Sequence, residues 1–290
     1  MRPASWLAVA ALAACGAAQG GGLVDGRIEL PKQLRELSGC VATDERTLVC
    51  VQDEKGALWF ADLRGERKIR SESFGPAGDY EGLARAADAW WVLRSDGVLL
   101  QLAPRDGAHA IAREVALPGG HPDWEALCFD ADGKRLLAMP KTCVGDDKEA
   151  RDRRPLFAVD PATGAVAKEP VLTLSRRALQ AGLEKLGTPL PTKATDKGNV
   201  KVDFELAVSE IAIVPGKREM LVLAGGDRLL LRVDFAGQLL GARALVAKDL
   251  PQAEGLAFLP DGRLLVASEA AGMVSIEPLQ KACALVVPLP

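Results

Sequence analysis

Glu81-Gly-Leu-Ala84 and Glu254-Gly-Leu-Ala-Phe258 are two copies of a motif in which a glutamate opens a short apolar run. The motif recurs with glutamates at Glu36, Glu81, Glu125, Glu210 and Glu254, which stand 45, 44, 85 and 44 residues apart. A polar turn and a second apolar run follow each copy. A repeat of about 40–45 residues that contains several short strands is typical of a β-propeller.

The apolar runs predict four strands in each repeat. First strands are expected at 37–42, 82–86, 126–129, 211–214 and 255–259, and second strands at 47–51, 90–93, 135–139, 219–223 and 263–267. Third strands are expected at 57–62, 98–103, 155–160, 229–234 and 273–277, and fourth strands at 68–74, 110–117, 171–174 and 242–246. We therefore predict an all-β fold, a five-bladed β-propeller, with six blades as the alternative if the termini build more sheet.

The last repeat has too little chain for an obvious fourth strand. Either residues 284–288 supply that strand, or the N-terminal segment 26–30 does. We favour the N-terminal segment, because strands from both ends of the chain then close the circle of blades and remove an exposed sheet edge.

The 85-residue interval contains one repeat and an insertion near 175–203. Residues 175–186 have the pattern of an amphipathic helix, with Ser175 as the N-cap and Gly187 just after the end. Residues 188–202 are expected to form a polar loop. Such an insertion is either a contact loop over a site or an ornament on one edge of the fold.

The N-terminus has the features of a targeting segment. Arg2 precedes an apolar stretch at 6–14 that is too short to cross a bilayer, and Leu12-Ala-Ala-Cys15 resembles a lipobox. We predict a lipoprotein signal peptide at 1–14, a lipidated Cys15 with a flexible tether over 15–25, and a single propeller domain over 26–290. An ordinary secretory signal is the alternative. Gly16, in place of the Asp that marks inner-membrane retention, favours the outer membrane, with the protein facing the periplasm or the exterior.

Composition excludes several classes of protein. The chain of 290 residues is 48% hydrophobic and 26% charged, and its net charge of -3 predicts no nucleic-acid partner. Two histidines, His109 and His121, are too few to favour an imidazole-based zinc site. Six cysteines lack any Cys-x-x-Cys pattern. Disulfides Cys40–Cys50 and Cys128–Cys143, or simple buried thiols, both remain open.

Carboxylates are expected to gather at one end of the propeller channel. The first and second strands of a blade run antiparallel, so the start of the first and the end of the second lie at the same end. Oxygen ligands from several loops suit Ca²⁺ better than Mg²⁺ or Zn²⁺. The five repeated glutamates are the candidate Ca²⁺ ligands, and the remaining ligand-face candidates are Asp53, Asp79, Arg94, Asp123, Lys141 and Glu269. The alternative is that the glutamates accept backbone N–H groups or pair with the two cations and hold the blades together.

Three other side chains are weaker candidates. His121 lies near Glu125 in the sequence and is a weak candidate for a general base, with an ordinary surface histidine as the alternative. Tyr80 and Trp124 each precede a channel glutamate, where they either form a stacking rim or pack between blades.

The order and spacing of several segments resemble the SdiA-regulated (YjiK-like) β-propeller family. The resemblance covers about residues 26–280 and rests on Glu36-Leu-Ser-Gly, Val51-Gln-Asp-Glu54, Gly78-Asp-Tyr-Glu-Gly-Leu-Ala84, Arg154-Pro-Leu-Phe-Ala-Val-Asp160, Ser209-Glu-Ile-Ala, Gln252-Ala-Glu-Gly-Leu-Ala-Phe258 and 265–269. It implies a small propeller on bacterial cell envelopes. It also implies a more distant similarity to calcium-dependent lactonase and phytase-like propellers, which carry acidic residues at the channel mouth. The chain departs from the family pattern in the insertion after Ser175, in Ala126 after Glu125 and in Ile211 after Glu210.

Three hypotheses for function follow. The first is an envelope-anchored binding module with an acidic, Ca²⁺-binding channel mouth that takes a small molecule or an envelope protein. The second is a Ca²⁺-dependent hydrolase of lactone or phosphate esters. The third is a metal-free scaffold. The sequence favours the first, because it marks no clear acid/base pair.

Overall fold

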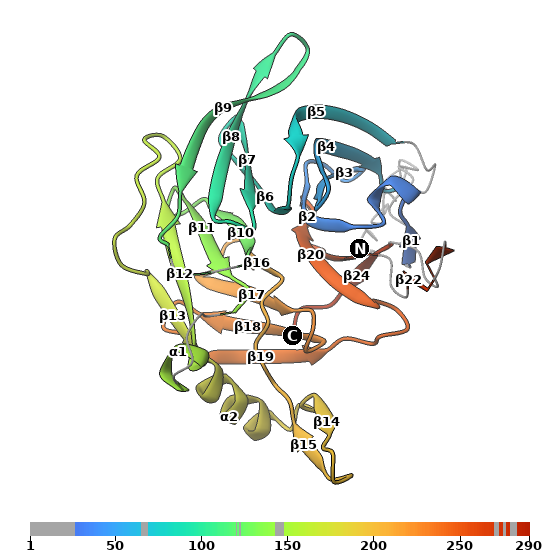
Figure 1. Cartoon of the computed structure of the whole chain (residues 1–290), viewed down its shortest axis with the longest axis vertical. Helices are drawn as coiled ribbons and strands as arrows, with labels where there is room; N and C mark the ends of the chain where they lie inside the picture. The colour runs from blue at the N-terminus through green and yellow to red at the C-terminus, as the bar shows by residue number, and fades with distance from the viewer. Residues whose placement is uncertain are drawn as a thin grey trace, which may run out of the picture.

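A computed structural model describes residues 27–64, 69–119, 121, 123–142, 148–269, 273–274, 277–278 and 283–290. Within these residues, five four-stranded antiparallel sheets surround a central channel (Figure 1), which confirms the predicted five-bladed propeller. The predicted signal peptide, the predicted lipidation site Cys15 and the predicted tether lie outside the described residues, as does Cys143. None of the described helices is long and apolar enough to cross a membrane.

Each blade is built from four strands, named in order from the innermost to the outermost. Blade 1 contains β2 (Leu37–Ala42), β3 (Thr47–Gln52), β4 (Lys55–Asp62) and β5 (Ile69–Ala77). Blade 2 contains β6 (Tyr80–Ala86), β7 (Ala89–Arg94), β8 (Val98–Arg105) and β9 (Ala108–Ala116). Blade 3 contains β10 (Trp124–Asp130), β11 (Arg135–Pro140), β12 (Arg153–Val159) and β13 (Leu172–Ser175). Blade 4 contains β16 (Glu210–Ile213), β17 (Glu219–Ala224), β18 (Leu229–Asp234) and β19 (Leu239–Ala244). Blade 5 contains β20 (Gln252–Phe258), β21 (Leu264–Glu269), β24 (Cys283–Val287) and β1 (Arg27–Glu29).

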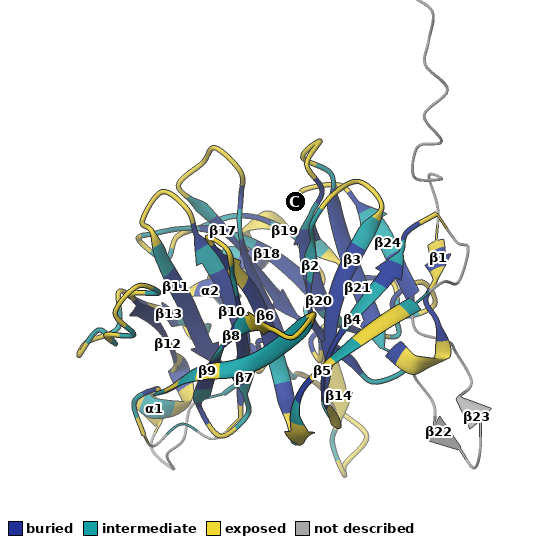
Figure 2. Cartoon of the chain, turned by 90° about the horizontal axis from the view of Figure 1, so that it is seen from above, coloured by how far each residue is buried: buried dark blue, intermediate teal, exposed yellow. Residues whose placement is uncertain are grey.

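The hydrophobic core lies between the blades. Middle strands such as β11 and β17 are apolar at almost every position, because each blade packs against a neighbour on both faces. Figure 2 shows the resulting concentration of buried residues in the strands and of exposed residues in the connections. The five innermost strands contact one another in the cyclic order β2, β6, β10, β16 and β20, so they form the wall of the channel.

The two ends of the chain close the propeller together. Strand β1 pairs with β24, with Arg27 opposite Leu285, and forms the outermost strand of blade 5, as predicted. The predicted third strand at 273–277 is wrong. Met273–Val274 (β22) pairs with Glu277–Pro278 (β23) in a separate small hairpin, and β24 takes the third position. The run 283–287 is apolar throughout and buries Cys283 and Ala284 fully, which favours it as the inner neighbour of β1.

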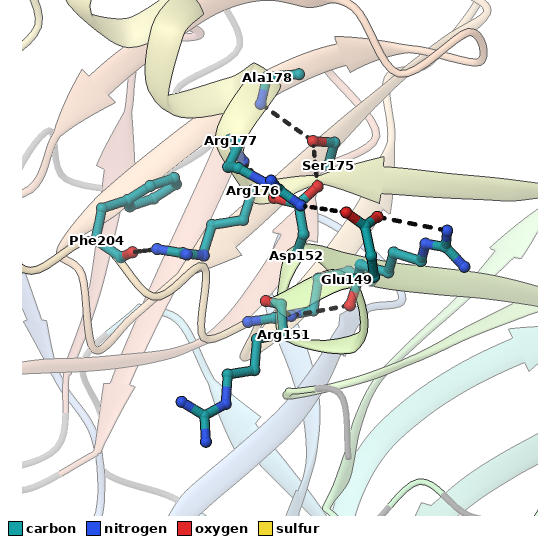
Figure 3. Close-up of polar contacts among 10 residues, drawn as sticks. Glu149, Arg151, Asp152, Ser175, Arg176, Arg177, Ala178 and Phe204 are labelled. Atoms are coloured by element: carbon teal, nitrogen blue, oxygen red, sulfur yellow. Dashed lines mark hydrogen bonds and ion pairs between the residues drawn. The ribbon is translucent and has the colours of Figure 1, made fainter. Parts of the chain in front are cut away.

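The insertion begins at the predicted helix. Helix α2 (Arg176–Leu186) has Ser175 as its N-cap, whose hydroxyl accepts a hydrogen bond from the Ala178 N–H, and Gly187 ends it with φ 68°. Asp152, which ends the short helix α1 (Lys148–Asp152), accepts hydrogen bonds from the Ser175 hydroxyl at 2.7 Å and the Arg177 N–H at 2.8 Å (Figure 3). A carboxylate at a helix N-terminus satisfies backbone donors and interacts favourably with the helix dipole.

The rest of the insertion differs from the expected polar loop. It contains an exposed hairpin of β14 (Thr192–Ala194) and β15 (Val200–Val202), which projects from the body of the propeller (Figure 1). Helix α2 packs beside β19 at the edge of blade 4. A short 3-10 helix, η1 (Lys32–Leu34), follows β1.

The described cysteines are buried free thiols. Cys40 and Cys50 lie directly opposite each other in the β2–β3 ladder, where the sequence left a disulfide and two thiols equally open, and both are free thiols. Cys128 and Cys283 are likewise free and buried.

Candidate functional site at the channel mouth

Three glutamates occupy the same irregular position in their blades. The β6–β7 ladder pairs Tyr80 with Arg94 and then Gly82 with Leu93, so Glu81 is the extra residue of a β-bulge. Corresponding register shifts lie on either side of Glu125 in blade 3 and of Glu254 in blade 5. A bulge leaves one residue outside the ladder and redirects its side chain, and bulges are common beside functional sites.

Glycines next to these positions explain why the motif repeats. A Cβ atom on Gly82 would lie 2.9 Å from the carbonyl oxygen of Glu125 in the next blade, and one on Gly39 would lie 2.9 Å from that of Glu81. One on Gly255 would lie 3.1 Å from the carbonyl oxygen of Ser38. The innermost strands therefore approach so closely that these positions have no room for a side chain.

The same contacts correct the predicted alignment of the five glutamates. Ser38 in blade 1 and Ser209 in blade 4 occupy the position of Glu81, while Glu36 lies two residues earlier. Glu210 lies one residue later, because it pairs with Leu223 in the β16–β17 ladder. We call the five equivalent residues the inner ring: Ser38, Glu81, Glu125, Ser209 and Glu254.

Two further rings of residues flank the inner ring. The strand-end ring contains the residues that follow or end each second strand: Asp53, Ser95, Lys141, Gly225 and Glu269. The outer ring contains the residues two positions before the inner ring: Glu36, Asp79, Asp123, Ala207 and Gln252. We call these fifteen residues the acidic mouth, since eight are acidic and one, Lys141, is basic.

Backbone hydrogen bonds join these rings from blade to blade. The N–H groups of Asp53, Ser95 and Lys141 donate to carbonyls of the outer ring in their own blades. The carbonyl of Asp53 then accepts from the Tyr80 N–H of the next blade at 3.2 Å, and the carbonyl of Lys141 accepts from the Val208 N–H at 3.0 Å. The mouth residues are therefore held by rigid elements of the fold.

Burial and mutual repulsion alter the protonation of these carboxyl groups. Burial, followed by the charge of Glu125, raises the pKa of Glu81 to about 9. Burial and then Glu254 raise the pKa of Glu269 to about 8, and burial and then Glu36 raise that of Asp53 to about 6. These shifts follow from placing several like charges in a partly dry region.

Lys141 is the cation of the acidic mouth. Its ammonium group donates to Glu125 Oε1 at 2.7 Å. Burial raises the pKa of Glu125 to about 7, against the opposing effect of Lys141. Burial alone would lower the pKa of Lys141, but Glu125, Glu254 and Glu81 outweigh it, and the pKa is raised. One ammonium group is therefore already bound among these carboxylates.

The arrangement contains no assembled metal site. Across the part of the chain that the structure describes, no three Asp, Glu, His or Cys side chains converge closely enough to hold one ion. Binding of Ca²⁺ would require carboxylates from different blades to move together, because hard cations of this kind take six to eight oxygen ligands. The calcium site stays a prediction.

Several candidate side chains lie elsewhere. Arg94 pairs with Asp96, at 3.1 Å between Nε and Oδ1, so its charge is directed to that turn. The imidazole of His121 packs edge-to-face on Trp124 and against Phe157, with ring centroids 5.7 Å and 6.0 Å apart, and burial lowers its pKa. Tyr80 and Trp124 are buried between blades and form no rim.

Glu210 links two neighbouring innermost strands, β10 and β16. It is 1% exposed, and its Oε1 accepts hydrogen bonds from the backbone N–H groups of Leu127 and Ile211, both at 2.9 Å. Both residues belong to innermost strands, whose unpaired edges face the channel. Burial, and less strongly Glu125 and Glu254, raise the pKa of Glu210 far above the usual value. No sequence signal distinguished this residue from the inner ring.

Comparisons with known proteins establish the fold. No family model matches the chain, and no curated protein matches its sequence. The crystal structure of glutaminyl cyclase from Myxococcus xanthus superimposes with a TM-score of 0.56 at 15% identity, covering 91% of this chain and 96% of that one. A glucose dehydrogenase-type oxidoreductase from Thermus thermophilus gives a TM-score of 0.50 at 10% identity, covering 90% and 99%. The two proteins are named for different reactions. The shared architecture therefore shows the fold and does not indicate an activity, which has to be argued from the site.

Proposed function

We propose that this protein is a binding module that holds a cationic ligand in its acidic mouth, and that lipid on Cys15 anchors it to the outer membrane of a bacterial envelope. The observation that carries the proposal is that the fifteen residues of the acidic mouth include eight acidic residues and one basic residue. The anchor rests on the lipobox-like segment that ends at Cys15.

A bound cation would reduce the electrostatic repulsion among the carboxylates of the acidic mouth. Partly buried carboxylates of like charge repel one another, and a bound positive charge removes the repulsion. Lys141 forms an ion pair with Glu125 and so neutralises one of these carboxylates. Glu81, Glu254 and Glu269 come from two other blades and supply further acceptors for a ligand with more than one donor.

Calorimetric titration tests the proposal with two probes of different geometry. Ca²⁺ and arginine amide are titrated separately into EDTA-treated protein, and then into Glu81→Gln/Glu254→Gln. Asp261→Asn, which changes an exposed carboxylate in the β20–β21 turn, serves as the matched control. Saturable binding of either probe that is lost in the double variant and kept in the control supports the proposal. Absence of binding of both probes to the unaltered protein refutes it.

A hydrolase is the second candidate, and Glu125 is the observation that favours it. A carboxyl group with a pKa of about 7 is suited to take and return a proton near neutral pH. Lactones are the better test substrates, because phosphate esters are repelled by the acidic mouth unless a metal ion is bound. Loss of lactone hydrolysis in Glu125→Gln, with the fold intact, would support this activity.

The resemblance to the SdiA-regulated propellers agrees with both candidates and selects neither. It rests on the quoted segments, such as 78–84 and 252–258. The ligand that we propose on this basis is a small molecule or a protein of the cell envelope.

A further inference from the structure

Blade 1 carries a pair of cysteines where the other blades carry aliphatic side chains. Cys40 in β2 lies opposite Cys50 in β3, in the rung of the ladder that comes two residues after the inner ring. The same rung of the other blades joins Leu83 to Val92, Leu127 to Ala138, Ile211 to Val222 and Leu256 to Val266. Only 6 of the 290 residues are cysteine, so a chance meeting of two at one rung is rare.

The hydrogen bonds of the β2–β3 hairpin show which type of rung this is. The N–H of Thr43 donates to the carbonyl of Thr47 at 3.0 Å, so these two residues form a hydrogen-bonded pair. Hydrogen-bonded and non-hydrogen-bonded pairs alternate along an antiparallel ladder. The register runs without a shift from this pair to Cys40 opposite Cys50, three rungs further along. The two cysteines therefore form a non-hydrogen-bonded pair.

A non-hydrogen-bonded rung brings two side chains close enough for a disulfide. Its Cα atoms stand about 4.5 Å apart, and its side chains are closer than those of the alternate rungs. A disulfide spans Cα separations of about 4.4–6.8 Å. Residues opposite each other also project from the same face of the sheet. In agreement with this, Cys40 and Cys50 belong to one apolar core, which lies between blade 1 and blade 5.

Blade 5 covers the two thiols. Cys40 is 2% exposed and Cys50 is 0% exposed, and Ala257 and Ala267 of blade 5 share their core. A Cβ atom on Gly255 would lie 2.7 Å from Cys40 Sγ, so this sulfur lies against β20. Burial raises the pKa of both thiols, and the charge of Cys50 raises that of Cys40 further. Because the thiolate is the reactive form, the covered pair is protected from exchange.

We propose that Cys40 and Cys50 are oxidised to an intramolecular disulfide before blade 5 closes onto blade 1. The oxidant is an external disulfide, either glutathione disulfide or that of an oxidoreductase. One protein thiolate attacks its S–S bond, forms a mixed disulfide and releases one thiolate, and the second protein thiolate then displaces the other. Two protein thiols are thereby oxidised, one external disulfide is reduced, and the two protons pass to the released thiolates.

The order of the elements along the chain allows this sequence of events. Both cysteines lie in one hairpin of blade 1, whereas the strands that cover them, β20 and β21, follow the strands of blades 2, 3 and 4. A hairpin forms from local contacts, and contacts of long sequence separation form more slowly. The predicted export enters only as the source of the oxidant, and the acidic mouth plays no part in the inference.

The bond should stabilise the hairpin against which the last blade packs. It closes the loop from residue 40 to residue 50 and so restricts the unfolded chain. We expect the oxidised protein to melt about 5–10 °C above the reduced protein.

Peptide mapping tests the pairing. Trypsin cleaves after Arg46, between Cys40 and Cys50, and so places them in separate peptides, 36–46 and 47–55, with one cysteine each. The protein is reduced and unfolded, refolded in a buffer of reduced and oxidised glutathione, unfolded again with iodoacetamide and digested. The expected product is the two peptides linked, with a mass two hydrogens below their sum. Alkylated or glutathione-bearing single peptides as the main products would overturn the proposal.

The folded, reduced protein provides a second reading that needs no refolding. It is placed in the same glutathione buffer, with and without urea below the unfolding midpoint. The linked peptide should form at least about tenfold more slowly without urea, because the thiols must first be uncovered. Equal rates under both conditions would contradict the proposed order of oxidation and closure, and no linked peptide under either would contradict the pairing.

Variants assign the change in stability. Cys40→Val/Cys50→Val restores the aliphatic rung of the other blades, and its melting temperature should be the same in reducing and oxidising buffer. Cys128→Ala is the matched control, because Cys128 is also buried in an innermost strand but lies opposite Leu137, and it should keep both the linked peptide and the shift in melting temperature. A shift that persists in the double valine variant would belong to other cysteines and overturn the assignment.

Discussion

Replacing Glu81 by glutamine should make the protein more stable at neutral pH. Glu81 is a bulge residue of the inner ring. Its carboxyl group is partly buried and lies near the charges of Glu125 and Asp79. An amide has nearly the same shape and carries no charge. The substitution therefore removes an unfavourable ionisation and leaves the packing of β6 in place.

The size of the effect follows from the two pKa values. The pKa is about 9 in the folded protein and has an ordinary value of 4.5 in an unfolded chain. Because the folded pKa is raised, the folded protein holds the proton more tightly, and stability falls as the pH rises from 4.5 through about 9. At pH 7 the carboxyl group lowers the free energy of unfolding by up to about 3 kcal/mol relative to a group that does not titrate.

Urea denaturation at pH 4.5, 7 and 8.5 checks this prediction. Glu81→Gln should match the unaltered protein at pH 4.5, exceed it by up to about 3 kcal/mol at pH 7, and exceed it further at pH 8.5. Glu45→Gln, in the exposed turn between β2 and β3, is the matched control and should change nothing. A difference that is the same at all three pH values, or a loss of stability at pH 7, would refute the reasoning. A stabilising result would show that the chain keeps a carboxylate at the expense of stability, as functional sites often do.

Three other substitutions test separate features. Gly82→Ala should lower the free energy of unfolding by about 1–3 kcal/mol or more, because the added Cβ would lie 2.7 Å from Leu127 Cβ. Gly119→Ala is the control and should cause no such loss, because no atom lies within 4 Å of its added Cβ. Equal melting temperatures for the two variants would contradict the packing argument. Ser175→Ala should remove the cap of α2 and cost about 1 kcal/mol in urea denaturation, and Ser175→Thr, which keeps the hydroxyl, should restore it. Cys15→Ser should move the protein from the membrane fraction to the soluble fraction and abolish labelling with radioactive palmitate; persistent labelling would exclude Cys15 as the anchor.

The repeat made the fold predictable, because each copy carries its own strand pattern and turn. The same logic failed in blade 5, where 273–277 has the spacing of a third strand but 283–287 takes that place. Spacing alone does not reveal which of two apolar segments finds a partner on each side. The longer segment wins because β1 pairs with its outer edge.

The sequence aligned three of the five repeated glutamates correctly and misaligned the other two. Glu81, Glu125 and Glu254 share one position, whereas Glu36 and Glu210 do not, because the constraint that repeats is close backbone packing at the following residue. Alignment on that residue would have identified the equivalent serines in blades 1 and 4. The hydrogen bond that Glu210 accepts from Leu127 joins β16 to the neighbouring strand β10, and no local pattern in the sequence encodes it.

The closing blade also sets the order of events during folding. Strand β1 precedes all the other strands described, and its partner β24 follows them, so Arg27 pairs with Leu285 across nearly the whole described chain. Until residues 283–287 are synthesised, β1 has no strand to pair with, and blade 5 consists only of its two inner strands, β20 and β21. Contacts of such long sequence separation form slowly. Closure of the propeller therefore depends on synthesis of β24, because a chain that ends before this strand cannot complete blade 5.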